Sequence, residues 1–83
     1  MARPLSPPPA ELDHAARVKD RHAGALLSVP GVHGVGVGVS ERDPERPALV
    51  ILMGKDARPG GRLPRRLEGL EVRILRTDPL RPL

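Results

Sequence analysis

The chain contains no cysteine and no aromatic residue, and it also lacks asparagine and glutamine. The absence of cysteine excludes disulfides and thiolate metal sites. Without Phe, Tyr or Trp, the core must be built from aliphatic side chains, each of which buries less area than an aromatic ring. The chain has 83 residues, enough for one small domain, and domains of this size often depend on disulfides, a metal or oligomerisation. Oligomerisation is therefore the first means of stabilisation to expect.

Long apolar runs are also missing. No run approaches the roughly 18 residues of a membrane span, and the first ten residues, MARPLSPPPA, lack the apolar segment of a secretory signal. The sequence therefore predicts a cytoplasmic protein with no membrane partner.

Arginine and proline are abundant. Of the 14 basic residues, 12 are arginine, and there are 11 prolines. Together with the missing thermolabile residues, this composition is typical of a protein adapted to heat, in which prolines stiffen the loops. A GC-rich genome enriches the same residues without selection on stability, and the two explanations are compatible.

The first third of the chain predicts an arm followed by a helix. Residues 1–9 are rich in proline and indicate an extended arm. We expect a helix over residues 10–28, ended by Pro30. Its apolar residues recur at helical spacing and draw one stripe: Leu12, Ala15, Ala16, Ala23, Leu26 and Leu27.

Residues 31–39 read GVHGVGVGV and predict a strand. His33, Val35, Val37 and Val39 share one parity, and Gly34, Gly36, Gly38 and Ser40 share the other. A strict period of two over eight residues is typical of a strand. Glycine weakens a strand unless another surface must come close, so the pattern indicates tight packing or a bend on that face.

The rest of the chain predicts two more strands. Residues 48–53, ALVILM, are apolar on both parities, so both faces should be covered. Residues 54–66 form a basic loop, with room for one helical turn toward Leu67, and residues 71–77 form the last strand. Short connections make sequential strands neighbours. We therefore predict an α+β domain over residues 10–77, with the N-terminal helix packed on a three-stranded antiparallel sheet, residues 48–53 in its middle, and residues 78–83 as a tail.

The glycines do not match a phosphate-binding loop. A dinucleotide fingerprint that begins at Gly34 needs a third glycine at position 39, which is Val39, and one that begins at Gly36 needs it at Glu41. The segment also follows a helix and is itself a strand, which reverses the required order. The phosphate-loop pattern fails as well, because Gly54 and Lys55 lead into Asp56.

The candidate ligands and nucleophiles do not form an active-site signature. His14 and His22 are eight residues apart on one helix, about 12 Å along its axis, which two ligands about 2 Å from one ion cannot span. A triad of Ser40, His33 and Asp43 can be drawn, but it rests on proximity in sequence alone. We therefore expect no enzymatic activity, no catalytic residue, no metal and no cofactor.

The positive charge lies in the C-terminal part. Residues 1–53 carry six basic and six acidic groups, whereas residues 54–83 carry eight basic and four acidic groups. Such a loop can hold the phosphates of a nucleic acid or another acidic surface, although no aromatic ring is present to stack a base. The possible polyanion-binding residues are Lys55, Arg58, Arg62, Arg65 and Arg66.

Self-association follows from the expected layers. One amphipathic helix covers one face of a sheet, whereas the strand at residues 48–53 is apolar on both faces. The apolar side chains on the uncovered face would stay in water, at a free-energy cost of about 25 cal/mol per Å² of exposed apolar surface. Open sheet edges offer another route to pairing. We predict a homodimer or a higher symmetric oligomer, with a sheet face or edge at the contact. The expected interaction residues are Gly34, Gly36, Gly38, Val50 and Leu52.

Three stretches also resemble a recurrent bacterial pattern: VPGVHGVGVGV, then PALVILM, then LPRRLEGLEVRILRTDPLRPL. That small α+β domain, with its PGVxGVGVG strand, occurs in uncharacterised proteins and before trypsin-like domains. The helix, the PGV turn and the strand are similar to part of the ferredoxin-like plan, without its first strand and without the paired cysteines of its metal carriers. The resemblance implies no catalytic residue, because its motifs are structural.

The sequence thus predicts a non-enzymatic protein-interaction or accessory module that self-associates. One alternative is a polyanion or nucleic-acid binder working through the basic loop. Another is a propeptide-like chaperone or inhibitor of a separate protease. The protein partner in these cases stays unidentified.

Overall fold

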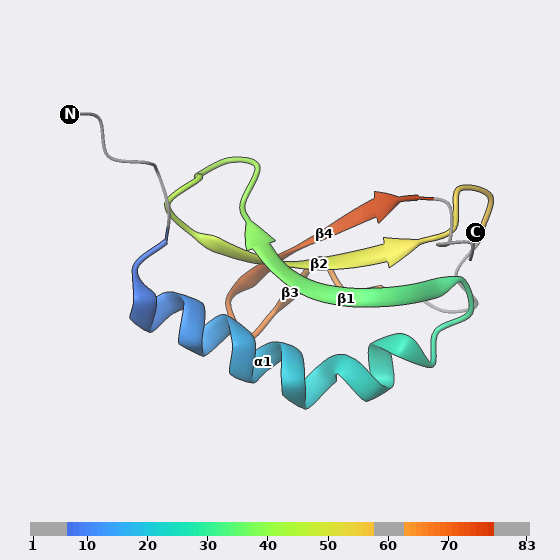
Figure 1. Cartoon of the computed structure of the whole chain (residues 1–83), viewed down its shortest axis with the longest axis horizontal. Coiled ribbons are helices and arrows are strands. Elements are labelled where there is room, and N and C mark those ends of the chain that lie inside the picture. Colours follow the sequence, from blue (N-terminus) through green and yellow to red (C-terminus); the bar gives the residue numbers. More distant parts are fainter. Residues whose placement is uncertain (1–6, 58–62, 78–83) are drawn as a thin grey trace, which may run out of the picture.

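The computed structural model describes residues 7–57 and 63–77, which form one helix and one sheet (Figure 1). In chain order the elements are α1 (Pro9–Leu27), β1 (Val32–Val39), β2 (Pro47–Met53), β3 (Arg66–Leu67) and β4 (Leu70–Arg76). The α+β class is confirmed. The predicted tail at residues 78–83 and most of the predicted arm lie outside the described residues.

The helix is close to its predicted bounds. Pro9 stands in its first turn, where a missing N–H costs nothing, and the carbonyl of Pro8 accepts the N–H groups of Glu11 and Leu12 at 3.0 and 3.1 Å. At the other end the Ser28 hydroxyl donates to the carbonyl of Ala25 at 2.6 Å. The helix therefore ends before Pro30, as predicted.

The glycine-rich stretch is a strand, and it pairs antiparallel with β2 in a register that joins Val35 to Ile51 and Gly38 to Ala48. Gly31, just before β1, has φ 93°, a backbone conformation that residues other than glycine rarely adopt. The strand and its alternation are confirmed from Gly34 to Val39, whereas a β-bulge or irregularity between Val32 and Gly34 leaves His33 outside the predicted register.

The sheet differs from the prediction in strand number and direction. It has four strands in the order β1-β2-β4-β3, and β2 lies between β1 and β4, as predicted. However, β4 runs parallel to β2, joining Leu49 to Val72 and Ile51 to Ile74, so the sheet is mixed rather than antiparallel. Residues 54–69 connect the two strands, and this is longer than the roughly dozen residues that a parallel crossover needs. The chain can therefore return to the start of β2 before β4 begins.

The predicted helical turn near Leu67 is a short strand instead. β3 pairs with β4 through a two-residue turn in which Glu68 has φ 48° and Gly69 has φ 83°. Two successive positive φ values are typical of the tight hairpin turn whose twist matches that of the strands. The side chain of Glu68 contacts α1, as described below, so this turn also fixes the hairpin to the helix.

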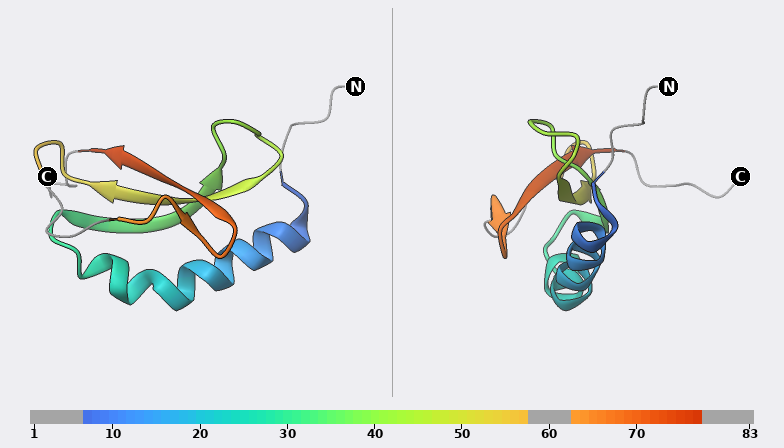
Figure 2. Two further views of the ribbon diagram at one scale, coloured as in Figure 1. Left: turned by 180° about the vertical axis from the view of Figure 1, so that it is seen from behind. Right: turned by 90° about the vertical axis from the view of Figure 1, so that its left-hand side faces the viewer.

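The core lies between α1 and one side of the sheet. Leu49, Ile51 and Met53 of β2 are completely buried, and Ala15 and Val18 of α1 pack in the same layer. Figure 2 shows α1 on this side of the sheet, while no helix or strand of the described chain lies against the other side. The domain therefore has two layers and one sheet face without a covering element.

Candidate self-association surfaces

The five residues predicted for self-association lie together on the sheet face away from α1. The register joins Gly34 to Leu52 and Gly36 to Val50, and paired residues point to the same side of a sheet. Since Leu49 and Ile51 point toward α1, their neighbours on β2 point away from it. We call this surface the outer face; its residues on β1 and β2 are Gly34, Gly36, Gly38, Ala48, Val50 and Leu52.

Much of the space above the glycines is filled from within the chain. A Cβ atom added to Gly38 would lie 2.8 Å from Cγ2 of Val50, and one added to Gly34 would lie 3.0 Å from Cδ1 of Leu52. Of the three outer-face glycines, Gly36 alone has open space, with no heavy atom of the described residues within 4 Å of the added Cβ. The space above two of the three glycines is therefore occupied by neighbouring side chains of β2. The sequence had predicted that a second layer would occupy this space.

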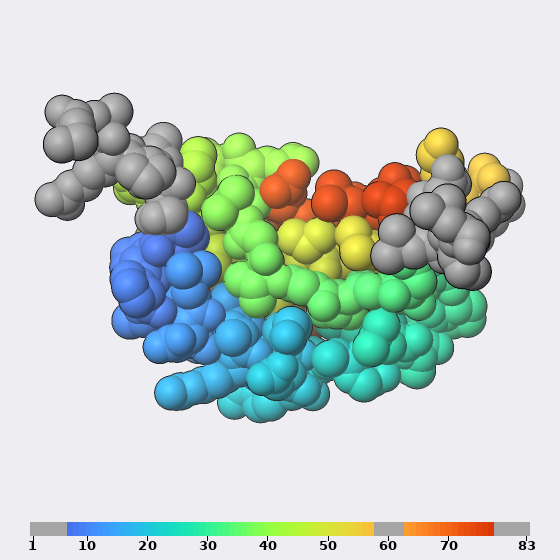
Figure 3. Space-filling model, in the orientation of Figure 1, coloured from blue at the N-terminus to red at the C-terminus, as the bar shows by residue number. Residues whose placement is uncertain are grey.

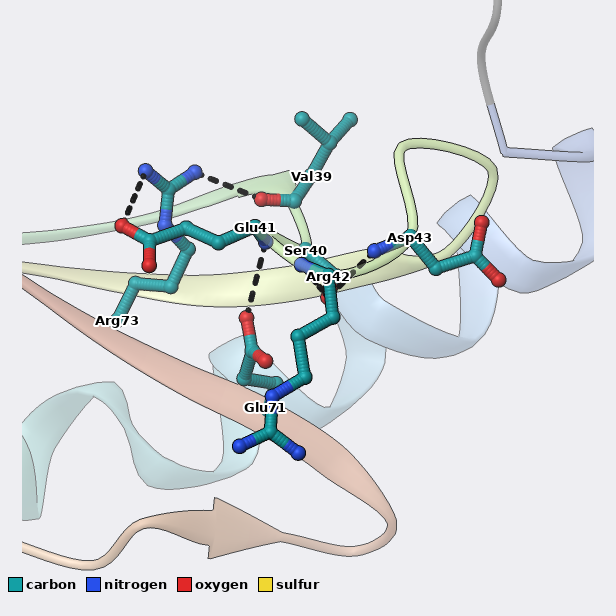
Figure 4. Close-up of polar contacts among 7 residues, drawn as sticks. All are labelled: Val39, Ser40, Glu41, Arg42, Asp43, Glu71 and Arg73. Carbon is teal, nitrogen blue, oxygen red and sulfur yellow. Dashed lines mark hydrogen bonds and ion pairs between the residues drawn. The ribbon is translucent and has the colours of Figure 1, made fainter.

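An arginine crosses one end of the outer face (Figure 4). Arg73 of β4 donates through Nη1 to the carbonyl of Val39 at 2.7 Å and through Nη2 to the carboxylate of Glu41 at 3.2 Å. Because β2 lies between β4 and β1, this side chain spans β2. Ala48, on the same face, is completely buried, and the Glu71 carboxylate accepts the Glu41 N–H at 3.2 Å. This end of the outer face is therefore closed by polar contacts within the chain.

The free edge of β1 is uncharged. β1 is the terminal strand of the sheet, and its sequence, VHGVGVGV, contains no charged residue. The N–H of Ser40 donates to the carbonyl of Arg46 across the loop, so by alternation the backbone N–H and C=O groups of Val35 and Val37 point away from β2. No hydrogen bond within residues 7–57 and 63–77 satisfies those groups at this edge. Proteins usually protect such an edge with charge, proline or a bulge. β1 has an irregularity of its register between Val32 and Gly34 only, and its edge from Gly34 to Val39 is regular and uncharged.

The flank of α1 beside this edge is apolar. Leu12 and Leu27 are 37% and 48% exposed, and Ala16 and Ala23 between them are half-buried. Their spacing of four, seven and four residues places them on one side of the helix. Val37 of β1 is exposed to the same extent as Leu12. β1 and α1 run next to each other across the face of the molecule shown in Figure 3. We call the free edge of β1 and this flank the edge surface.

The opposite flank of α1 is polar and has partners. Arg21 and His22 contact the two carboxylate oxygens of Glu68 at 2.7 and 3.0 Å, and Nε2 of His14 lies 3.5 Å from the Glu68 carbonyl oxygen. Glu68 belongs to the turn between β3 and β4. Because β3 and β4 lie on the other side of β2 from β1, these contacts confirm that the apolar flank faces the β1 side.

Part of the predicted basic loop borders a surface hollow. Arg58 and Arg62 lie outside the described residues. Arg65 and Arg66 line a hollow of about 690 Å³ together with Arg42, which comes from the loop after β1. Glu41, Glu71 and Arg73 also line it, so four arginines stand against two glutamates. In the described part of the chain, no carboxylate lies within ion-pair distance of Arg42, Arg65 or Arg66. Lys55 does not line the hollow.

The residues that the sequence offered as catalytic or metal-binding candidates lie apart from one another or form hydrogen bonds with other residues nearby. His33 stands near the start of β1, with Nε2 3.1 Å from the hydroxyl of Thr77. Ser40 follows the other end of β1, and its hydroxyl accepts the N–H groups of Arg42 and Asp43. The triad drawn from the sequence is therefore not assembled. Within residues 7–57 and 63–77, no three His, Cys, Asp or Glu side chains are grouped as a metal site would require.

Comparison with known proteins gives no match to a family model, to a curated protein or to a solved structure. Among the described residues, no helix has the length and apolar character to cross a membrane.

The sequence analysis did not identify two arginines that contribute to these surfaces, Arg42 and Arg73. Each lies in a short charged segment of the kind that is usually solvated. Arg73 bonds to Val39, 34 positions earlier in the chain, and Arg42 joins Arg65 and Arg66 only because the β1–β2 loop lies beside β3 and β4. No local signal connects residues at such separations.

Proposed function

We propose that this protein is a non-enzymatic interaction module that associates with a second copy of itself. The observation that carries this proposal is where the exposed apolar side chains lie. Of six large apolar residues with substantial exposure in the described chain, four belong to β1 or to the flank of α1 beside it: Leu12, Leu27, Val37 and Val39.

The physical reason is the cost of leaving this surface in water. Apolar area contributes about 25 cal/mol per Å² when it is buried, and a domain of this size has a small core and few other means of stabilisation. The chain has no cysteine and cannot add a disulfide. The outward backbone groups of Val35 and Val37, which have no hydrogen-bond partner among the described residues, add a directional component, because a second strand would satisfy them.

Light scattering of the full chain at rising concentration tests the proposal. The chain has a mass of 8.9 kDa, and we expect a particle of at least twice that mass at micromolar concentration. A mass that stays at one chain up to millimolar concentration would contradict self-association.

The arginines around the hollow favour a second candidate function, the binding of a phosphate-rich polyanion. Arg42, Arg65 and Arg66 converge there from two distant segments, and none has a carboxylate partner in the described chain. Arginine binds phosphate in a planar, bidentate manner. Without aromatic rings, recognition would depend on the backbone phosphates rather than on stacked bases.

Binding of a short DNA duplex at several salt concentrations tests this second function. Replacing Arg42, Arg65 and Arg66 with alanine should reduce the slope of log affinity against log salt by roughly 0.9 for each phosphate that the variant no longer neutralises. Arg17→Ala is the matched control, because Arg17 is an exposed arginine of α1 away from the hollow. An equal change in the control, or affinity that does not depend on salt, would count against a specific polyanion site.

A further inference from the structure

We infer that the second copy docks on the edge surface about a two-fold axis that passes near Gly36 and between Lys19 and Asp20. In this arrangement two β1 strands pair antiparallel, and the two sheets become one continuous sheet with both helices on the same side. The inference rests on the proposed self-association and specifies its contact.

The apolar flank of α1 has the symmetry that such a contact requires. In a two-fold interface, residue i contacts residue j of the partner and j contacts i. Leu12 and Leu27 are centred on the point between Lys19 and Asp20, and so are Ala16 and Ala23. Antiparallel helices would therefore place leucine against leucine and alanine against alanine, and the small alanines allow close approach at the centre.

Charge is also complementary at that centre. Lys19 and Asp20 are in contact within one chain, with Nζ 3.3 Å from the carboxylate. In the antiparallel arrangement, Lys19 lies opposite Asp20 of the partner subunit, and the reverse pair forms at the same time. No like charges are brought together by these two residues, so the polar middle of an otherwise apolar flank does not oppose docking.

The strand edge obeys the same symmetry. The backbone groups of Val35 and Val37 point outward from the sheet, as the Ser40 to Arg46 hydrogen bond indicates. Pairing about Gly36 sets Val35 opposite the partner subunit's Val37, and each such pair exchanges two backbone hydrogen bonds. Residues opposite each other then have the same parity, so every valine stays on the helix side of the combined sheet.

A single two-fold axis can relate both the two α1 helices and the two β1 strands. The midpoint between Lys19 and Asp20 lies about 11 Å along the helix from its end at Leu27, at 1.5 Å per residue. Val32 and Gly36 pair with Met53 and Val50, three residues apart on β2, so Gly36 lies about 10 Å along the sheet from Val32, at about 3.3 Å per residue. Since α1 leads into β1 through a short turn, the two centres lie at nearly the same distance from that turn.

A single cysteine tests this contact, because the natural chain has none. Gly36 would face Gly36 of the partner subunit as a non-hydrogen-bonded pair, with Cα atoms about 4.5 Å apart, within the range of a disulfide. The site has open space for a side chain. Under mild oxidation by oxidised glutathione, two Gly36→Cys chains should lose their thiol protons and join through one disulfide, giving most of the protein as a covalent dimer.

Gly24→Cys is the matched control, because Gly24 is exposed, also has open space, and lies on the solvent side of α1. We expect it to remain mostly unlinked under the same conditions. A second test replaces Val37 with lysine, which should reduce the particle to one chain, while Leu75→Lys should not. Leu75 has almost the same exposure, 38% against 37%, but lies on β4.

The outcomes separate this inference from the proposed function. A particle of two chains that forms no Gly36→Cys disulfide and survives Val37→Lys, with circular dichroism showing each variant folded, overturns the edge contact and leaves self-association standing. A natural chain that is monomeric at every concentration overturns both. A covalent dimer at Gly36, with dissociation by Val37→Lys only, supports both.

Discussion

The two edges of the sheet differ in charge and in what lies beside them. β1 has no charged residue in eight positions, whereas the opposite side of the sheet has charges on both strands and in the turn between them: Arg66, Glu68, Glu71, Arg73 and Arg76. The helix repeats the difference, with Leu12 and Leu27 toward β1 and with Arg21 and His22 toward the β3–β4 turn.

The charged side largely finds its partners within the chain. Glu68 is held by Arg21 and His22, and Arg73 is held by Val39 and Glu41. On the uncharged side, Leu12, Leu27 and Val37 remain exposed, and the outward backbone groups of Val35 and Val37 have no hydrogen bond among the described residues. Another apolar surface and another strand would satisfy them. This difference is the reason that we propose β1, rather than the outer face or β4, as the site of self-association.

Adding charge to the uncharged side should have the largest effect. The double substitution Leu12→Lys and Leu27→Lys removes four leucines from the symmetric contact and brings four lysines together. Leu12 and Leu27 are only 37% and 48% exposed, so each has about 0.7–1 kcal/mol left to gain on burial. For the four leucines together, we expect the dimer dissociation constant to rise about 100-fold or more, as measured by sedimentation equilibrium.

Ala25→Lys provides the control for this pair, because Ala25 is exposed on the flank of α1 toward Arg21 and His22. It should leave the dissociation constant within a few-fold of the natural value. Equal weakening by both substitutions would mean that the two flanks do not differ in association.

Removing the charge at the β3–β4 turn should have a smaller effect, on stability and not on association. Glu68→Ala removes the contacts of the carboxylate with Arg21 and His22 and keeps a side chain at φ 48°. These contacts are partly exposed, so their removal costs about 0.5–1 kcal/mol. Glu68→Gly removes the same contacts but relieves about 1 kcal/mol of left-handed backbone strain, so its net change should be close to zero.

Urea denaturation at fixed protein concentration measures both variants. The informative quantity is the difference between their free energies of unfolding, since both variants lack the same contacts. If Glu68→Gly were no more stable than Glu68→Ala, the turn would not be strained at this residue.

The smallest effect is expected on the outer face. Gly36→Leu adds bulk where the added side chain meets no neighbour within the chain, and in the edge dimer two such leucines lie side by side on the solvent side of the sheet. The dissociation constant should therefore change by less than about threefold, as followed by light scattering on dilution. Complete dissociation would instead indicate that two outer faces stack, the contact that the sequence had suggested.

Much of the fold was predictable because its signals are local. The alternation of glycine and valine predicted β1, the stripe that includes Leu26 predicted α1, and Pro30 set the helix end. The apolar run at residues 48–53 indicated a central strand, and β2 is indeed paired on both sides. The predicted antiparallel direction of the last strand was wrong, because residues 54–69 have no sequence pattern that distinguishes a hairpin from a parallel crossover.

The candidate surfaces were predicted less completely. The sequence placed Gly34, Gly36, Gly38, Val50 and Leu52 on one face, which the register agrees with. It did not show that Val50 and Leu52 lie over two of the glycines, because that depends on side-chain packing between strands. It also did not rank a face above an edge, since the strand order was needed to establish that β1 is terminal.

By itself, the sequence determined α1, β1, β2 and the last strand, the lack of disulfides and the presence of an apolar surplus, because these depend on composition and on periodicities of two and 3.6 residues. It did not determine β3, where it predicted a helical turn. Only the tertiary structure decided where that surplus lies. Parallel pairing of β4 with β2 brings Glu68 within reach of Arg21 and His22, and Arg73 within reach of Val39. The uncharged β1 is thereby left at the open edge, because which strand ends a sheet depends on pairings between residues far apart in the chain.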